Sequence, residues 1–360
     1  MGMWVLRLGV VLLGVILLLV AANMLAPRLL DRVYYRGPVS DHFDGQRFFN
    51  LDDPLAAARP RGFSPWRFVR FALGMERAPW PASVPVTQTI PPARVEGDAM
   101  RVTWIGHATV LVQTQGLNIL TDPIWSERAS PFSFAGPKRV RAPGVAFDHL
   151  PKIDLVLVSH NHYDHLDLPT LRRLWERDRP LIVTPLGNDT ILHKAGIASV
   201  ARDWGQRVMV RPGIDVIVER VHHWGSRSGA DRNRALWSGF TVTLPGGNLF
   251  FAGDTGWGDG SWPRAVAKDG PYRLALIPIG AYRPRELMGP SHVDPGEAVA
   301  IYRALGAAYG LGVHWGTFQL SAEGFDQPRL DLGAALEAEH IPADHFRAVA
   351  PGQEWVVPAR

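Results

Sequence analysis

Hydrophobic residues follow three different patterns along the 360-residue chain. Residues 1–30 are dominated by an apolar stretch with arginines on both sides. Residues 31–100 are rich in proline, arginine and aromatic residues without a regular period, which predicts an irregular arm that wraps the rest of the protein or lies at a membrane surface. From residue 101, short apolar runs alternate with amphipathic segments. This pattern predicts a catalytic domain of strands and helices over residues 101–360.

Apolar or alternating runs bounded by turn residues predict the strands of this domain. The predicted strands are residues 101–105, 109–114, 117–121, 153–158, 181–184, 214–220, 240–244, 248–252, 273–279, 310–313 and 354–357. The predicted helices are residues 169–178, 188–195, 294–307 and 330–339. The third helix has a clear beginning, because Asp294, Pro295 and Glu297 form a capping-box pattern. Hairpins followed by alternating strands and helices predict an α/β fold in which helices flank a sandwich of two sheets.

The apolar amino-terminal stretch predicts a transmembrane helix. Residues 8–22 carry no charge, and with residues 23–30 the stretch is long enough to cross a bilayer. A cleaved signal peptide is the alternative, because Ala21 and Ala22 are small residues near its end. We favour the uncleaved anchor, since the apolar run is long and no clean cleavage site follows. The chain is then a single-pass protein of a bacterial inner membrane, with the side of the catalytic domain left open.

The composition restricts the chemistry that the chain can use. The absence of cysteine excludes disulfides, thiolate metal sites and cysteine nucleophiles. Imidazole and carboxylate groups must therefore bind any metal ion, and these donors suit zinc best, with iron or manganese as alternatives. The net charge of +4 is small for this length, and no basic run contains interleaved aromatic residues. We therefore predict no nucleic-acid partner.

Candidate metal ligands are concentrated in residues 160–167, which read His-Asn-His-Tyr-Asp-His-Leu-Asp directly after the apolar run 153–158. Three other predicted strands lead to His222-His223, Asp254 and His314. The end of a buried strand holds a ligand rigidly, and the loop that follows leaves space for a substrate. His160, His162, Asp164 and His165, with one ligand after each of the three other strands, make seven. Seven ligands suit two ions if one carboxylate bridges them, and Asp254 is the natural bridge. Two ions about 3.5–4 Å apart activate water for attack on a phosphoryl or carbonyl group.

Several short sequence motifs resemble those of the metallo-β-lactamase superfamily. They are residues 104–109 (Trp-Ile-Gly-His-Ala-Thr), 121–123, 160–167, 251–256 (Phe-Ala-Gly-Asp-Thr-Gly) and 313–316. Within the superfamily, the chain looks most like the N-acylphosphatidylethanolamine-hydrolysing phospholipase D family. The motifs similar to those of that family are residues 128–131, 136–139, 277–282, 292–295 and 314–318. The resemblance spans residues 100–350 and implies an αββα sandwich with two zinc ions.

The resemblance also implies roles for single residues. The implied metal ligands are His160, His162 and His223 for one zinc, Asp164, His165 and His314 for the other, and Asp254 between them. His223 is the implied ligand rather than His222, because the family's histidine directly precedes a tryptophan. Asp164 and His292 are the implied catalytic residues. Tyr163 and His292 are the implied contacts of the phospholipid.

Three further polar residues near these motifs are candidates for supporting roles. Asp122 either orients a metal ligand or caps a turn. Asp167 is a candidate for a hydrogen bond that supports a ligand histidine. His107 is expected to be a buried structural histidine, although the resemblance places it near the active-site face.

The ligand set and the resemblance together predict a membrane-associated binuclear zinc phosphodiesterase. A hydroxide held by the metal ions attacks phosphorus, and N-acylphosphatidylethanolamine yields phosphatidate and an N-acylethanolamine. Two alternatives stay open: a lactonase or carboxylic-ester hydrolase with the same metal centre, and a membrane-bound binding protein without activity. The predicted partners are the phospholipid and the membrane, and a homodimer is left open.

Overall fold

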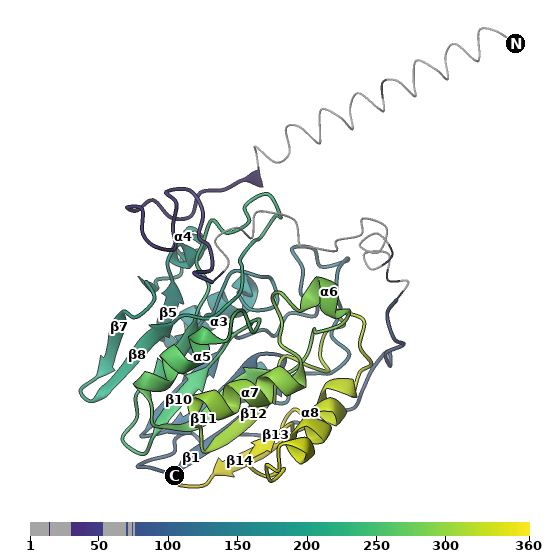
Figure 1. Ribbon diagram of the computed structural model, residues 1–360. Helices are drawn as coiled ribbons and strands as arrows, with labels where there is room; N and C mark the ends of the chain where they lie inside the picture. The colour runs from purple at the N-terminus through teal and green to yellow at the C-terminus, as the bar shows by residue number, and fades with distance from the viewer. Residues whose placement is uncertain (1–13, 15–29, 53–69, 71–73, 75) are drawn as a thin grey trace, which may run out of the picture.

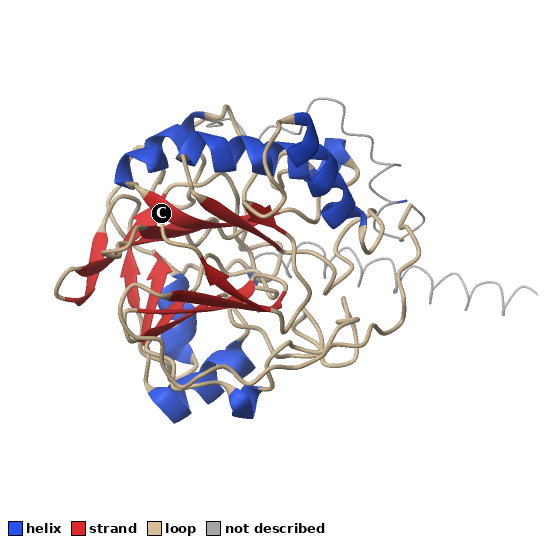
Figure 2. Cartoon of the chain, turned by 90° about the horizontal axis from the view of Figure 1, so that it is seen from below, coloured by secondary structure: helices blue, strands red, loops and turns tan. Residues whose placement is uncertain are grey.

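Two mixed β-sheets lie face to face in the computed structural model, and helices cover both outer faces (Figure 2). The structure describes residues 14, 30–52, 70, 74 and 76–360. In spatial order, the described strands of the first sheet are β14 (Glu354–Val357), β1 (Met100–Gly106), β2 (Thr109–Thr114), β3 (Leu117–Thr121), β4 (Leu155–Leu157), β5 (Leu181–Pro185) and β6 (Val200–Arg202). Those of the second sheet are β13 (Phe346–Arg347), β12 (Tyr309–Val313), β11 (Tyr272–Pro278), β10 (Asn248–Phe251), β9 (Gly239–Val242), β8 (Ile214–Glu219) and β7 (Arg207–Arg211).

The helices divide between the two outer faces of the sandwich. The described helices are α3 (Leu168–Asp178), α4 (Asn188–Lys194), α5 (Ser261–Val266), α6 (Arg285–Met288), α7 (Pro295–Leu305) and α8 (Gln327–Ala338), with short 3-10 turns η1 (Phe147–His149) and η2 (Ala267–Asp269). Helix α4 contacts β5 and β6 of the first sheet, and α7 contacts β11 of the second sheet as well as α5 and α8. The order of layers is therefore helix, sheet, sheet, helix, which confirms the predicted sandwich.

Alternation along the strands distributes apolar side chains between two cores. In β2, Val110 and Val112 join the core between the sheets, whereas Leu111 joins a second core with Leu171 and Leu174 of α3. All five side chains are fully buried. The first sheet is thus apolar on both faces, which fixes its register, because a shift by one residue would exchange the two sets.

The predicted capping box at the start of α7 is confirmed. The Asp294 carboxylate accepts a hydrogen bond from the backbone N–H of Glu297, and the Glu297 carboxylate accepts one from the Asp294 N–H. Helix α8 begins three residues before its predicted start, because Pro328 suits the first turn of a helix. The sequence pattern did not predict the short elements β6, β7, β13, α5 and α6.

The prediction of a single-pass protein in a bacterial inner membrane is corrected by the structure. Within the described residues, no helix combines the length and the apolar character needed to cross a bilayer. The apolar stretch of residues 8–30 on which the prediction rested lies outside the described residues, apart from Gly14 and Leu30.

The described parts of the predicted arm lie against the sandwich. Phe43 and Phe48 are buried in the main apolar core, and residues 30–52 run beside α4 in Figure 1, where the Thr190 hydroxyl of α4 donates to the Tyr34 carbonyl. Farther along, Val84 pairs with Arg141 in an isolated bridge. Residues 53–69, 71–73 and 75 of the predicted arm lie outside the described residues.

Candidate metal centre

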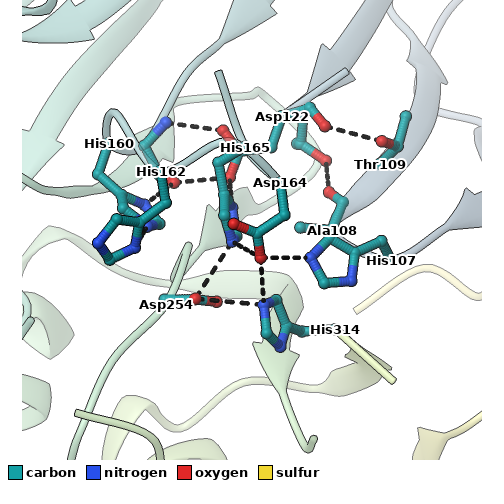
Figure 3. Close-up of polar contacts among 12 residues, drawn as sticks. His107, Ala108, Thr109, Asp122, His160, His162, Asp164, His165, Asp254 and His314 are labelled. Carbon is teal, nitrogen blue, oxygen red and sulfur yellow. Dashed lines mark hydrogen bonds and ion pairs between the residues drawn. The ribbon is translucent and has the colours of Figure 1, made fainter. Parts of the chain in front are cut away.

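The candidate ligands follow strands that end at one edge of the sandwich. Strands β10, β11 and β12 are parallel, and β8 has the same direction because β9 is antiparallel to both β8 and β10. The loops after β8, β10 and β12 therefore meet at one edge, where the loop after β4 of the first sheet joins them (Figure 3). This arrangement gathers side chains that are up to 154 residues apart, from His160 to His314.

Two groups of ligand-type side chains lie at this edge. The first, the three-histidine group, consists of His160, His162 and His223, and one ligand atom from each lies within 4.8 Å of the others and of Asp254. In this group, His160 Nε2 and His162 Nδ1 are 2.8 Å apart. The three rings come from two loops, since β4 precedes His160 and His162 whereas β8 precedes His223.

The second, the aspartate group, consists of Asp164, His165 and His314. Their ligand atoms also lie within 4.8 Å of one another, together with His107. Asp164 Oδ2 is 3.3 Å from His165 Nε2 and 3.4 Å from His314 Nε2. Each group, together with Asp254, offers the imidazole and carboxylate atoms needed to hold one metal ion.

Asp254 lies between the two groups (Figure 3). Its Oδ2 is 3.1 Å from His165 Nε2 and 3.2 Å from His314 Nε2, and 3.9 Å from His223 Nε2. Gly253 precedes it with a φ of +61°, and a Cβ at that position would lie 2.5 Å from the Ser159 side chain. A glycine is therefore required for the close approach of the Asp254 loop to the loop after β4.

Several atoms that face this site are buried and lack a hydrogen-bond partner among the described residues. They include Asp254 Oδ1, His223 Nε2 and His292 Nδ1. A buried polar atom without a partner costs about 1–3 kcal/mol, so an arrangement of several needs a compensating interaction. Cations held between the rings and carboxylates would supply it, so the residues present fit two metal ions.

Buried groups behind the ligands fix their orientation. Asp122 is fully buried, and its Oδ2 accepts from His165 Nδ1 at 2.6 Å, which leaves His165 Nε2 for the site. Its two oxygens also accept from the Ser159 N–H and hydroxyl. Of the two predicted roles of Asp122, the structure thus favours the orientation of a ligand.

His107 is buried as expected, and it also contacts the aspartate group. Its Nε2 is 2.9 Å from Asp164 Oδ2, and its backbone carbonyl accepts the N–H of His314 at 2.9 Å. His107 and His314 have φ values of +53° and +63°. Such backbone is unfavourable for residues other than glycine and is retained where the surrounding contacts require it. One residue thereby restrains two members of the aspartate group.

The proposed support of a ligand histidine by Asp167 is wrong. The Asp167 carboxylate accepts from the Ser126 N–H and hydroxyl and from the Thr170 hydroxyl, and no ligand contacts it. It lies at the N-cap of α3 and ties that helix to the segment after β3. The ring of His222 also points away from the metal groups, because its Nδ1 pairs with Asp52.

His292 and Tyr163 border the ligand groups. The His292 ring centroid is 5.3 Å from that of His223 and 5.7 Å from that of His314, and its Nδ1 is 3.9 Å from Asp254 Oδ2. The Tyr163 ring lies under the guanidinium of Arg227, 3.6 Å from its centroid. His292 is thus close enough to the ligand groups to contact a substrate there, whereas Tyr163 adjoins them in sequence, between His162 and Asp164.

The electrostatics of the site reflect the burial of carboxylates beside imidazoles. Burial alone would raise the pKa of Asp254, but the neighbouring His165 and His314 hold it well below its usual range. Burial and the adjacent histidines lower the pKa of His160 well below its ordinary value. Burial lowers the pKa of His292 to about 4. Burial alone would lower the pKa of His165 and His314, but the neighbouring carboxylates raise the pKa of His165 well above its ordinary value and that of His314 to about 9. These two rings would lose a proton on binding a metal ion, because neutral imidazoles and ionised carboxylates are the binding forms.

Comparisons with known proteins agree with this geometry. A family model described as the Beta-lactamase superfamily domain matches residues 117–315. The chain belongs to this superfamily. It is 38% identical over 265 residues to N-acyl-phosphatidylethanolamine-hydrolyzing phospholipase D 1 of Caenorhabditis elegans, across 70% of this chain and 74% of the relative. It is 36% identical over 241 residues to the mitochondrial enzyme of the same name from Saccharomyces cerevisiae, across 65% of this chain and 51% of that protein.

Solved structures of two other metalloproteins share the fold. Igni18, a metallo hydrolase of Ignicoccus hospitalis, aligns with a TM-score of 0.55 at 18% identity, covering 73% of this chain and all of that chain. The diiron β-hydroxylase CmlA of Streptomyces venezuelae aligns with a TM-score of 0.54 at 20% identity, covering 73% of this chain and 54% of that chain. As a member of the beta-lactamase superfamily, the chain is a metal-dependent hydrolase.

Some residues that shape the site of this superfamily member were not identified from the sequence. Asn50 and the carbonyl of Ser291 hold His223, and Arg227 donates to the carbonyls of Asn161 and Leu166 in the loop after β4. No spacing rule connects these residues to the ligands, because the contacts span 61 to 173 positions of the chain.

Proposed function

We propose that this member of the beta-lactamase superfamily is a binuclear metal phosphodiesterase that hydrolyses N-acylphosphatidylethanolamine-type phospholipids. The observation that carries the proposal is the place of Asp254, whose Oδ2 approaches ligand atoms of both groups. The relatives from worm and yeast are named for this activity. The products are phosphatidate and an N-acylethanolamine.

The donor set determines which ions suit the site. The proposed ligands of one ion are His160, His162 and His223, those of the other are Asp164, His165 and His314, and Asp254 contacts both. Imidazole and carboxylate without thiolate suit zinc, and iron or manganese accept the same donors. When bound, the two ions supply Lewis acidity toward a phosphoryl oxygen and lower the pKa of water.

His292 is proposed to bind the phosphate of the substrate. Its side chain is 12% exposed and borders both ligand groups. Because burial lowers its pKa to about 4, the imidazole is neutral near pH 7 and donates one hydrogen bond without carrying an extra proton. We therefore assign it to the orientation of a phosphoryl oxygen rather than to protonation of the leaving alcohol.

Asp164 and Tyr163 are proposed to act beside His292. The contacts of Asp164 with His107, His165 and His314 all involve Oδ2, so Oδ1 is left to accept a hydrogen bond from water or substrate. Tyr163 is held against Arg227 and is proposed to contact the phospholipid head group. In the overall reaction, water adds to phosphorus, the bond from phosphorus to the N-acylethanolamine oxygen breaks, and a proton goes to that oxygen.

A lipid panel tests the proposal. The metal-loaded protein is incubated with N-acylphosphatidylethanolamine, with other phospholipids, and with lactones and carboxylic esters, and the products are identified by mass spectrometry. We expect phosphatidate and N-acylethanolamine from the wild type and neither from Asp254→Asn, a nearly isosteric variant. A protein that holds two ions, leaves every phosphodiester intact and opens lactones or esters would overturn the proposal.

A further inference from the structure

The backbone of His223 lies beyond the regular part of its strand. Strand β8 ends at Glu219, whereas His222 still pairs with Gly256 in an isolated bridge. His223 itself has no backbone partner for its N–H or its carbonyl within the described residues. Because His223 is only 2% exposed, water does not readily replace these partners.

Asn50 provides both missing partners through one side chain. Its Nδ2 donates to the His223 carbonyl at 2.9 Å, and its Oδ1 accepts the His223 N–H at 3.2 Å. The same Oδ1 accepts from the Trp237 indole at 3.1 Å. This set fixes the orientation of the amide, since the reversed amide would place donors against donors. Asn50 therefore restrains the backbone of His223 at two points.

The ring of His223 is restrained separately. Its Nδ1 donates to the Ser291 carbonyl at 2.9 Å, so its Nε2 faces Asp254. With the backbone held by Asn50 and the ring held by Ser291, the direction of Nε2 is determined. A metal ligand needs such control, because partners behind the ligand set its orientation and the affinity for the ion.

Asp52 holds the residue before the ligand. Its Oδ2 is 2.9 Å from His222 Nδ1 and accepts the Asp259 N–H at 3.0 Å. Gly258 makes room for this pair, since a Cβ there would overlap both Asp52 and His222. The φ of Gly258 is +60°, which also favours glycine. The pair thus connects residue 52 to the loops that carry His223 and Asp254.

The segment that carries Asn50 and Asp52 is anchored independently of the metal centre. Phe43 and Phe48 are each 1% exposed within the main core. His42 lies between Asp41 and Asp203, at 2.6 and 2.8 Å, and its ring stacks on Trp204. The segment is therefore fixed on the sandwich on its own and can transmit that rigidity to His223.

We propose that Asn50 and Asp52 are positioning residues that hold His223 in the orientation required for binding a metal ion. The inference rests on the proposed assignment of the three-histidine group as a metal site. It gives the segment before the catalytic sheets a part in the metal centre. It also predicts that loss of the Asn50 and Asp52 contacts lowers the affinity for the ion of the three-histidine group and leaves the affinity for the ion of the aspartate group unchanged.

The test measures metal affinity in the full-length protein. Wild type, Asn50→Ala and His223→Ala are titrated with a competing chelator, and the visible absorption of the cobalt-substituted proteins reports which ligands remain. For Asn50→Ala we expect one of two ions to be bound about 10- to 100-fold more weakly, with a cobalt spectrum shifted toward that of His223→Ala. Thr190→Val is the matched control, since it removes another hydrogen bond from the same segment, to the Tyr34 carbonyl, without touching His223.

Asp52→Asn is a second, nearly isosteric variant in case Asn50→Ala does not fold. We expect the affinity for the ion of the three-histidine group to fall by a smaller factor, because Asp52 contacts His222 rather than His223. Unchanged affinities and spectra in the folded variants would overturn the inference, as would a parallel loss of both ions that Thr190→Val reproduces. A wild type that holds fewer than two ions would instead contradict the proposed function, so the two failures are distinguishable.

Discussion

The two ligand groups of the metal centre are held by different kinds of contact. The aspartate group is oriented from within the sheets by a buried carboxylate and a ring, since Asp122 accepts from His165 and His107 contacts Asp164. In the three-histidine group, His223 depends instead on neutral hydrogen bonds from distant segments, because Asn50 and the Ser291 carbonyl hold it. We infer that the two ions respond separately to changes in their surroundings.

The largest effect is expected where the two groups meet. Asp254→Asn removes the shared charge while it preserves the shape of the side chain, so the protein should bind both ions more weakly. Because the reaction depends on both ions, kcat/KM for phosphodiester hydrolysis should fall by at least about 10³-fold. Parallel measurement of metal content and kinetics checks this expectation. Retention of both ions with normal activity would remove the basis for a shared carboxylate.

Asp122→Asn should affect the aspartate group more than the three-histidine group, which Asp122 reaches only through the Ser159 hydroxyl beside His160 Nδ1. The variant loses the charge that pairs with His165, so the affinity for that ion should fall by about 10- to 100-fold. Chelator titration of the variant beside wild type measures the change. The affinity for the ion of the three-histidine group should fall by a smaller factor, because its contact with Asp122 is indirect. An equal loss of both ions would show that the groups are not supported separately.

A substitution at Glu219 should change the stability of the fold without changing the affinity for metal ions. Burial, chiefly, raises the pKa of this carboxyl at the end of β8 to about 7, so the folded protein holds its proton more tightly than the unfolded chain does. The raised pKa contributes stability at low pH, and this contribution is lost as the pH rises from about 4.5 to about 7.

Glu219→Gln should remove that pH dependence. The difference in free energy of unfolding between variant and wild type should increase by on the order of 2–3 kcal/mol, in favour of the variant, from pH 4.5 to pH 8. The reason is that a tenfold change in proton affinity corresponds to about 1.4 kcal/mol. Denaturant unfolding of the metal-free proteins at the two pH values measures it. Since Glu219 contacts neither ligand group, metal affinity at pH 7 should not change. A variant that gains nothing at high pH would refute the assignment of a neutral Glu219.

The smallest effect is expected at Tyr163, which lies on the loop shared by both groups. Tyr163→Phe keeps the ring against Arg227 and removes only the hydroxyl. If that hydroxyl contacts the head group, KM should rise by about 2- to 10-fold, which corresponds to one lost hydrogen bond, while metal content stays the same. Steady-state kinetics on a single phospholipid separates KM from kcat. An unchanged KM would exclude Tyr163 from substrate binding.

The same contrast explains how much the sequence could predict. His160, His162, Asp164 and His165 lie together in one motif after an apolar run, so local pattern was sufficient to identify them. The sandwich followed from the order of predicted hairpins, strands and helices, and the choice of Asp254 and His314 as ligands followed from their places after predicted strands and from family resemblance. Those parts depend on short-range order and on repeated strand geometry.

The supporting contacts could not be predicted in this way. Asn50 is 173 positions from His223, and nothing in its neighbourhood marks it as different from any polar residue near a turn. Asp122 and Asp167 both follow or precede regular elements and looked equally able to support a ligand, yet only Asp122 points to one. Their side-chain directions depend on the packing of the loops in three dimensions.

Anomalous X-ray diffraction from crystals of the metal-loaded protein tests the central claim most directly. The account predicts two peaks about 3.5–4 Å apart. One should be coordinated by His160, His162 and His223, the other by Asp164, His165 and His314, with Asp254 in contact with both. A single peak, or two peaks that are not both within coordination distance of Asp254, would contradict this prediction.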